Sequence, residues 1–127
     1  MLQLSSRRSN ETIGTELVNL RTKDQNGQKG YSYYKQKYGD RFVYIGCNIR
    51  FQPQIPRSIW CNIYHGQLKK LGREKVVQLY REYIMKKPEL LAQIPTLRGK
   101  VLACWCAPAL CHGHVLLELL SSIRNTQ

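Results

Sequence analysis

The sequence predicts a small single-domain α/β fold, with a short and mainly parallel sheet flanked by helices, like one half of a Rossmann fold. The chain has 127 residues, a length that suits a single domain. The expected elements follow one another as strand, strand, loop, helix, short helix, strand and helix. A strand–helix–strand connection of this length points to parallel pairing, because antiparallel neighbours need only a tight turn.

The first half of the chain contains two expected strands. Residues 1–14 are polar and are expected to form a flexible tail, ahead of a single domain at 15–124. Residues 15–20 alternate weakly and predict a short strand, and residues 41–46 contain a continuous apolar run typical of a strand buried on both faces. Between them, residues 21–40 combine an Asn-Gly turn signal with lysines and four tyrosines, which predicts a hairpin insertion or a mobile loop.

The second half begins with a loop over residues 47–66, which contains two prolines. The apolar residues of 72–87 recur at helical spacing and predict the clearest helix of the chain. A short second helix is expected to begin at Pro88 and to end at Pro95. A short apolar strand then leads into a last helix at about 111–123, which has one apolar stripe.

The charge balance indicates an anionic partner. Twenty Lys and Arg stand against eight Asp and Glu, so the formal charge is +12, and we expect nucleic acid or nucleotide phosphate as partner. No apolar run approaches the roughly 18 residues of a membrane span, and the first residues lack the apolar core of a secretory signal. Five cysteines without such a signal indicate a reducing compartment and free thiols. We therefore expect an intracellular protein, cytoplasmic or nuclear, with no membrane partner.

Basic residues are interleaved with aromatic ones in the stretch before the second strand. This pattern suits the stacking of bases combined with contacts to phosphates. The alternative is that the tyrosines lie on the domain as a partial lid. The candidate residues for binding nucleic acid or another ligand are Tyr31, Tyr33, Tyr34, Lys35, Lys37, Trp60, Asn62 and Arg98.

Three cysteines and two histidines cluster between the last strand and the last helix. Zinc takes four Cys or His ligands at a structural site. The candidate zinc ligands are Cys104, Cys106, Cys111 and His114. A loop folding over this turn would add further candidates, namely Cys47, Cys61 and His65. Against zinc, the C-x-C pair stands alone, without the second ligand pair that most zinc signatures have.

Two other interpretations of this cluster stay open. Cys111 lies near the start of the last helix, where backbone N–H groups and the helix dipole stabilise a thiolate. With His112 or His114 as the neighbouring base, Cys111 is a candidate catalytic nucleophile. Alternatively, the cysteines pack in the core as small apolar side chains.

Three motifs carry a resemblance to a known family. They are Tyr44-Ile45-Gly46, Trp60-Cys61-Asn62, and the stretch from Leu97 to Leu116 that contains C-W-C-x-P-x-x-C-H-G. Over about residues 15–122, the chain resembles an uncharacterised "domain of unknown function" family of small bacterial, phage and viral proteins. The resemblance implies a compact α/β domain in which the loop motifs meet near the cysteine cluster, and it implies no particular activity.

The chain departs from that family's pattern at three positions. Where the family has an arginine, a proline and an acidic residue, this chain has Cys47, Ile63 and His114. Two of the replacements, Cys and His, are metal-ligating types, which favours the zinc interpretation.

The leading hypothesis from the sequence is a basic α/β module with a Cys/His zinc site that binds nucleic acid. The first alternative is a small enzyme that processes a nucleotide or nucleoside with a Cys111 thiolate and His112 as base. The second is an accessory factor that binds another protein. The sequence leaves open whether the chain is an enzyme.

Overall fold

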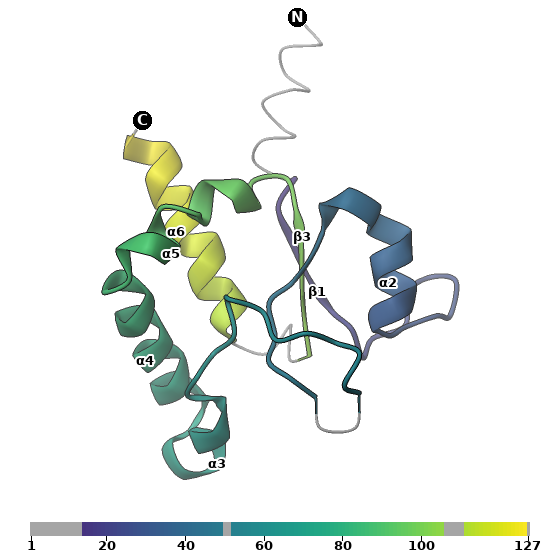
Figure 1. Cartoon of the computed structure of the whole chain (residues 1–127), viewed down its shortest axis with the longest axis horizontal. Coiled ribbons are helices and arrows are strands. Elements are labelled where there is room, and N and C mark those ends of the chain that lie inside the picture. Colours follow the sequence, from purple (N-terminus) through teal and green to yellow (C-terminus); the bar gives the residue numbers. More distant parts are fainter. Residues whose placement is uncertain (1–13, 50–51, 106–110, 127) are drawn as a thin grey trace, which may run out of the picture.

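The computed structural model describes residues 14–49, 52–105 and 111–126. Its strands and helices form one small α/β unit (Figure 1). In chain order the elements are β1 (Glu16–Asn19), α2 (Tyr31–Tyr38), the 3₁₀ helix η1 (Gly39–Arg41), β2 (Phe42–Tyr44), the 3₁₀ helix η2 (His65–Gln67), α3 (Leu68–Leu71), α4 (Arg73–Met85), α5 (Pro88–Leu91), the 3₁₀ helix η3 (Ile94–Leu97), β3 (Val101–Cys104) and α6 (His112–Thr126).

The three strands form one parallel sheet in the order β1–β3–β2, with β3 in the centre. Glu16 at the start of β1 and Phe42 at the start of β2 both lie opposite Val101 at the start of β3. All four residues of β3 are buried. The apolar run of this strand therefore suits a central parallel strand, which is covered on both faces.

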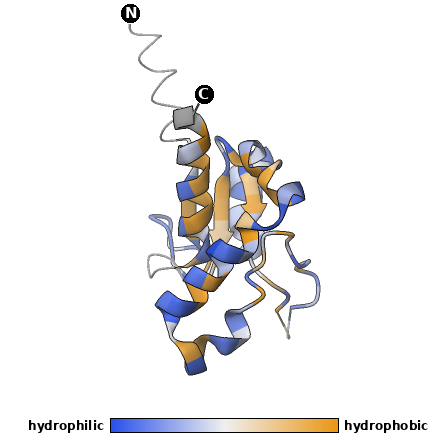
Figure 2. Ribbon diagram, turned by 90° about the vertical axis from the view of Figure 1, so that its left-hand side faces the viewer, coloured by the Kyte–Doolittle hydropathy of each residue, from blue (hydrophilic) through white to orange (hydrophobic). Residues whose placement is uncertain are grey.

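Helices α4, α5 and α6, together with η3, cover one face of the sheet (Figure 1). Apolar residues gather on the strands and on the side of the long helix α6 that faces them (Figure 2). Leu102 points to this side from β3, because alternate residues of a strand point to opposite faces. Within α4, Val77, Tyr80 and Ile84 recur at helical spacing and form the buried stripe. This side contains the larger apolar core.

Helix α2 covers the other face, to which Ala103 points. Four tyrosines of this helix contribute half-buried or buried rings around Leu20 and Ala103. The ring of Tyr31 lies edge-on to the rings of Phe42 and Tyr44, with centroids 5.4 and 5.5 Å apart. This face is therefore covered by an aromatic layer with few fully buried side chains.

The predicted α/β fold with a small parallel sheet is confirmed. The strands expected at 15–20 and 41–46 are present as β1 and β2, and the helices expected at 72–87 and 111–123 are present as α4 and α6. The prediction for 21–40 is wrong in its second half, which forms α2. Tyrosines spaced three and four residues apart place their rings on the sheet, and this packing stabilises a helix there.

The flexible tail expected at residues 1–14 falls, except for Gly14, outside the described residues. In the part of the chain that is described, no helix combines the length and the apolar character needed to cross a bilayer.

Candidate functional site

A cleft of about 520 Å³ opens where the strands end at their carboxyl ends. Open α/β sheets bind ligands at this edge, and known small-molecule sites measure roughly 300–1,000 Å³. The described residues that line the cleft are Arg21, Gly46, Cys47, Asn48, Ile49, Asn62, His65, Leu68, Arg73, Cys104, Trp105 and His112. The cleft is therefore built from the ends of all three strands, the loop after β2, and the starts of α4 and α6.

The described lining of the cleft is basic. Arg21 and Arg73 both contribute to it, and none of the described lining residues is Asp or Glu. The guanidinium carbon of Arg21 lies 6.0 Å from the centre of the Trp105 ring, a cation–π distance. Trp105 is held in turn, because its Nε1–H donates to the hydroxyl of Tyr44 at 2.9 Å. The rim thus presents a positive charge beside a fixed aromatic ring.

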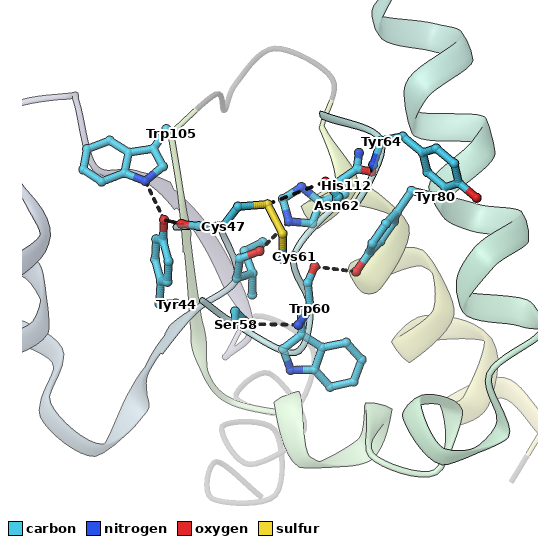
Figure 3. Close-up of a disulfide and its surroundings, with 11 residues drawn as sticks. Tyr44, Cys47, Ser58, Trp60, Cys61, Asn62, Tyr64, Tyr80, Trp105 and His112 are labelled. Atoms are coloured by element: carbon cyan, nitrogen blue, oxygen red, sulfur yellow. Dashed lines mark hydrogen bonds between the residues drawn. A yellow bond between two sulfur atoms is a disulfide. The ribbon is translucent and has the colours of Figure 1, made fainter. Parts of the chain in front are cut away.

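One wall of the cleft is a loop closed by a disulfide between Cys47 and Cys61 (Figure 3). The prediction of free thiols at these two positions is therefore wrong. The prediction that they contribute to a metal site is wrong for the same reason. A disulfide sulfur has no thiolate to give to a metal. The bridge joins the chain just after β2 to the residue before Asn62, and so holds Asn62 at the cleft.

Asn62 is only 5% exposed, and its amide has a fixed orientation. Its Oδ1 accepts the backbone N–H of Tyr64 at 2.8 Å, which is an Asx turn. The loop before it is anchored to α4, because the hydroxyl of Tyr80 donates to the carbonyl of Trp60 at 2.7 Å (Figure 3). Disulfide, Asx turn and tyrosine hydrogen bond together fix this part of the loop.

His112, the first residue of α6, is 7% exposed and lies at the floor of the cleft. Its Nε2 is 2.6 Å from the carbonyl oxygen of Ile45, directly after β2. A carbonyl can only accept, so the proton of the neutral ring is on Nε2. Burial lowers the pKa of His112, although its hydrogen bond to Ile45 acts in the opposite direction. The ring is therefore neutral near pH 7.

Gly113 allows this close approach of α6 to the sheet. A Cβ at this position would lie 2.5 Å from Cδ1 of Leu17 and 3.0 Å from Cδ1 of Ile45. A larger residue would have to displace the ends of these two side chains where α6 packs on the sheet. The glycine of the C-H-G motif thus has a packing role beside the preceding histidine.

The leading hypothesis, a zinc-containing module that binds nucleic acid, is wrong. Among the residues that the structure describes, no group of three or more His, Cys, Asp and Glu side chains is placed to hold a metal ion. His114 instead caps α6, because its Nδ1 accepts the N–H of Cys111 at 3.0 Å. The sulfurs of Cys104 and Cys111 lie 3.9 Å apart, and both side chains are buried. Cys106, the remaining expected ligand, lies outside the described residues.

The nucleophile proposed for the alternative enzyme, Cys111, is 3% exposed. Its Sγ accepts the N–H of Gly113 at 3.3 Å, and the residue lines a recess of about 20 Å³ behind the cleft. Such a recess has room for about one water-sized group. His112, the expected base, already donates from Nε2 to Ile45. The two side chains both line this recess, and a recess of this size does not let a substrate reach the thiol from the cleft.

The tyrosines expected to stack on bases pack against the protein instead. Tyr34 is buried and donates to the carbonyl of Thr22 at 2.6 Å. Tyr33 donates its hydroxyl to Asp24. With Tyr31 on the aromatic layer, these rings lie on the domain, as in the partial-lid alternative. The rings are engaged within the fold, which removes the basis for the predicted nucleic-acid surface.

The lysines of the same stretch are also engaged with the protein. Lys37 forms an ion pair with Asp24 at 2.8 Å. Hydrogen bonds from Lys37 and then Tyr33 hold the pKa of the Asp24 carboxyl well below its usual range. Nζ of Lys35 lies 5.6 Å from the centre of the Tyr31 ring.

Two further candidate residues lie away from the cleft surface. The Trp60 side chain is buried in the larger core. Arg98 follows η3, at the start of the strand that ends at the cleft, and therefore lies at the opposite edge of the sheet. Its Nε and Nη2 atoms are buried without a hydrogen-bond partner. Of the remaining candidates, Asn62 and His65 do line the cleft.

Both arginines of the cleft are missing from the residues predicted from the sequence. Arg21 follows the strand predicted at 15–20, and side chains just beyond parallel strands meet at one edge of the sheet. That position identifies it as a candidate. Arg73 opens α4 after Gly72, and its place at the cleft depends on how the loop and α3 fold, which residue spacing does not encode.

Comparison with known proteins places the whole cleft inside a family domain. The model of the domain of unknown function DUF4326 matches residues 18–122, a span that includes every described residue of the cleft. An uncharacterised protein of Acanthamoeba polyphaga mimivirus is 34% identical over 94 residues, covering 65% of this chain and 69% of the viral protein. No solved structure matches the chain. The chain therefore belongs to the DUF4326 family, whose function is unknown.

Proposed function

We propose that the protein binds a small phosphate-bearing ligand of the nucleotide class in the cleft at the carboxyl end of its sheet. The observation that carries this proposal is the charge of the cleft. Arg21 and Arg73 line it, and no acidic residue is among its described lining. Arginine recognises phosphate through paired N–H donors, and a positive cleft favours an anionic occupant.

The start of helix α6 adds to the same positive field. His112 opens this helix at the cleft floor, so the positive end of the helix dipole points towards an occupant. The neutral ring of His112 adds no charge of its own at pH 7. The field at the floor thus comes from the arginines and from backbone dipoles.

The aromatic ring at the rim supports a nucleotide over a simple phosphate. Trp105 lines the cleft beside Arg21, and its ring is held by the hydroxyl of Tyr44. An indole face of this kind stacks on a base of any type. The size of the cleft suits a single nucleotide and not a polymer.

Isothermal titration calorimetry tests the proposal with inorganic phosphate and the four ribonucleoside monophosphates, at low salt. We expect Arg21→Gln to weaken nucleotide binding about tenfold or more, because a charge-assisted hydrogen bond contributes about 1.5–3 kcal/mol. Arg81→Gln is the matched control. Arg81 lies on α4, is paired with Glu118 at 2.7 Å, and does not line the cleft.

Two results would contradict the proposal. The first is the absence of binding by all of these ligands at millimolar concentrations. The second is an equal loss of affinity in Arg21→Gln and Arg81→Gln, which would show that only the overall charge attracts phosphate.

A further inference from the structure

The ring of His112 presents one hydrogen-bond acceptor to the cleft. Its Nε2–H is used by the carbonyl of Ile45 at 2.6 Å. In the neutral ring the other nitrogen, Nδ1, carries a lone pair and no proton. The described chain offers Nδ1 no hydrogen-bond partner. His112 therefore accepts, and does not donate, at this position.

The side chain of Asn62 presents a hydrogen-bond donor to the same cleft. Its Oδ1 is used by the N–H of Tyr64 at 2.8 Å. That hydrogen bond also fixes which end of the amide is oxygen, because a backbone N–H cannot donate to the NH₂ group. The Nδ2 group, with two hydrogens, thus remains for an occupant.

Both unused atoms keep access to the cleft. In the described part of the chain, the only side-chain polar atoms sealed from solvent without a partner belong to Arg98. Asn62 is 5% exposed and His112 is 7% exposed. Both line the main cleft and the small recess behind it. The surface that they retain therefore faces this space. Figure 3 shows the two side chains next to each other beside the disulfide.

We infer that His112 and Asn62 form a subsite that recognises the hydrogen-bonding edge of a nucleobase, with Nδ1 accepting from the base and Nδ2 donating to it. This inference rests on the proposed function, and it assigns the two ends of the ligand. The arginines take the phosphate, and the base lies against the ring of Trp105 with its hydrogen-bonding edge directed to His112 and Asn62 at the floor. Every nucleobase has a neighbouring N–H donor and acceptor on this planar edge, whereas a sugar phosphate without a base has only hydroxyl groups on a non-planar ring.

The geometry of the subsite also predicts what it rejects. Nε2 of His112 and Oδ1 of Asn62 are already used in hydrogen bonds within the protein. His112 therefore cannot become a donor to the ligand, and Asn62 cannot become an acceptor. A base whose donor is replaced by a methyl group would leave Nδ1 of His112 unpaired in a desolvated site. Leaving a buried polar group unpaired costs far more than losing an exposed contact.

The base subsite is tested first by comparing the binding of several ligands to the wild-type protein. Calorimetry compares each of the four ribonucleoside monophosphates with ribose phosphate, and with the same nucleotide methylated on its hydrogen-bonding edge. We expect the preferred nucleotide to bind about tenfold or more tightly than both. If ribose phosphate binds as tightly as the nucleotides, or if methylation has no effect, the base subsite is refuted while the phosphate site stands. If no probe binds, the proposed function fails as well.

Asn62→Asp tests the donor from the protein side. The variant keeps an oxygen for the N–H of Tyr64 and turns the donor towards the ligand into an acceptor. We expect the preference for the nucleotide over ribose phosphate to disappear. Asn48→Asp is the control, because it adds the same charge at an exposed lining residue. A preference that survives in Asn62→Asp, or that disappears equally in Asn48→Asp, would overturn the assignment.

Discussion

Among the described residues, fourteen buried ones form a continuous apolar core between the sheet and helices α4, α5 and α6, whereas three lie between the sheet and α2. On the α2 side, half-buried tyrosines take the place of aliphatic side chains. The two sides therefore contribute to the free energy of unfolding through different interactions. The α4–α6 side depends on buried area, and the α2 side depends on ring contacts and on hydrogen bonds near solvent.

The cleft is lined by residues from both the α4–α6 side and the α2 side of the sheet. Asn62 and His112 at its floor are anchored to the α4–α6 side, through the disulfide loop and through α6. Arg21 and Trp105 at its rim belong to the α2 side. We therefore expect a rigid floor and a more adaptable rim.

The largest difference between the two sides is expected from core truncation. Leu102→Ala removes a fully buried side chain from the α4–α6 side and should lower the free energy of unfolding by about 3 kcal/mol. Val18→Ala, on the partly buried α2 side, should cost about 1 kcal/mol or less. Urea unfolding of both variants measures this, and equal losses would show that the two sides do not differ.

The disulfide should account for the next largest effect. Its two cysteines are 14 residues apart, and closing a loop of this length stabilises a fold by about 2–3 kcal/mol. The double variant Cys47→Ser with Cys61→Ser should lose this amount in urea unfolding. A phosphine reductant should lower the stability of the wild type to the same level and leave the double variant unchanged. A wild type insensitive to the reductant would speak against the bridge.

A matched tyrosine pair gives the smallest and sharpest comparison. Tyr80→Phe and Tyr34→Phe each remove one hydrogen bond to a backbone carbonyl, at 2.7 Å on the α4–α6 side and at 2.6 Å on the α2 side. The Tyr80 bond is fully buried, so its loss should cost about 1–2 kcal/mol, because the carbonyl of Trp60 is left unpaired. The Tyr34 bond is only part-buried, and its loss should cost about 0.5–1 kcal/mol. The reverse order in thermal or urea unfolding would show that α2 is the more tightly held side.

The elements with a single clear pattern were predictable from the sequence. The continuous apolar run at 101–104 and the helical spacing around Tyr80 each match one period, and both elements are present. In helix α2, tyrosine and lysine fill most positions, so the helical spacing of its tyrosines does not stand out as an apolar stripe. Its rings become a packing face only against the sheet, so the tertiary structure decides its conformation.

The candidate site was predictable in part. The sequence points to Asn62 and to His112, and the structure places both at the cleft. Their hydrogen-bonding roles depend on Tyr64 and on Ile45, and the second of these contacts joins residues 67 positions apart. The disulfide between Cys47 and Cys61 could not be predicted from the sequence, because a reducing compartment favours free thiols. The two sulfurs come together only when the loop is folded.

The central position of β3 sets an order of events during synthesis. Both neighbours of this strand precede it, and Gly99 hydrogen-bonds Thr15 across 84 residues of chain. While a ribosome is still making the residues before 101, β1 and β2 have no strand to pair with. Their edges remain open until the last part of the domain emerges, and pairing over such separations is slow. We therefore expect a truncated product that ends before residue 101 to be prone to aggregate through these unpaired strands.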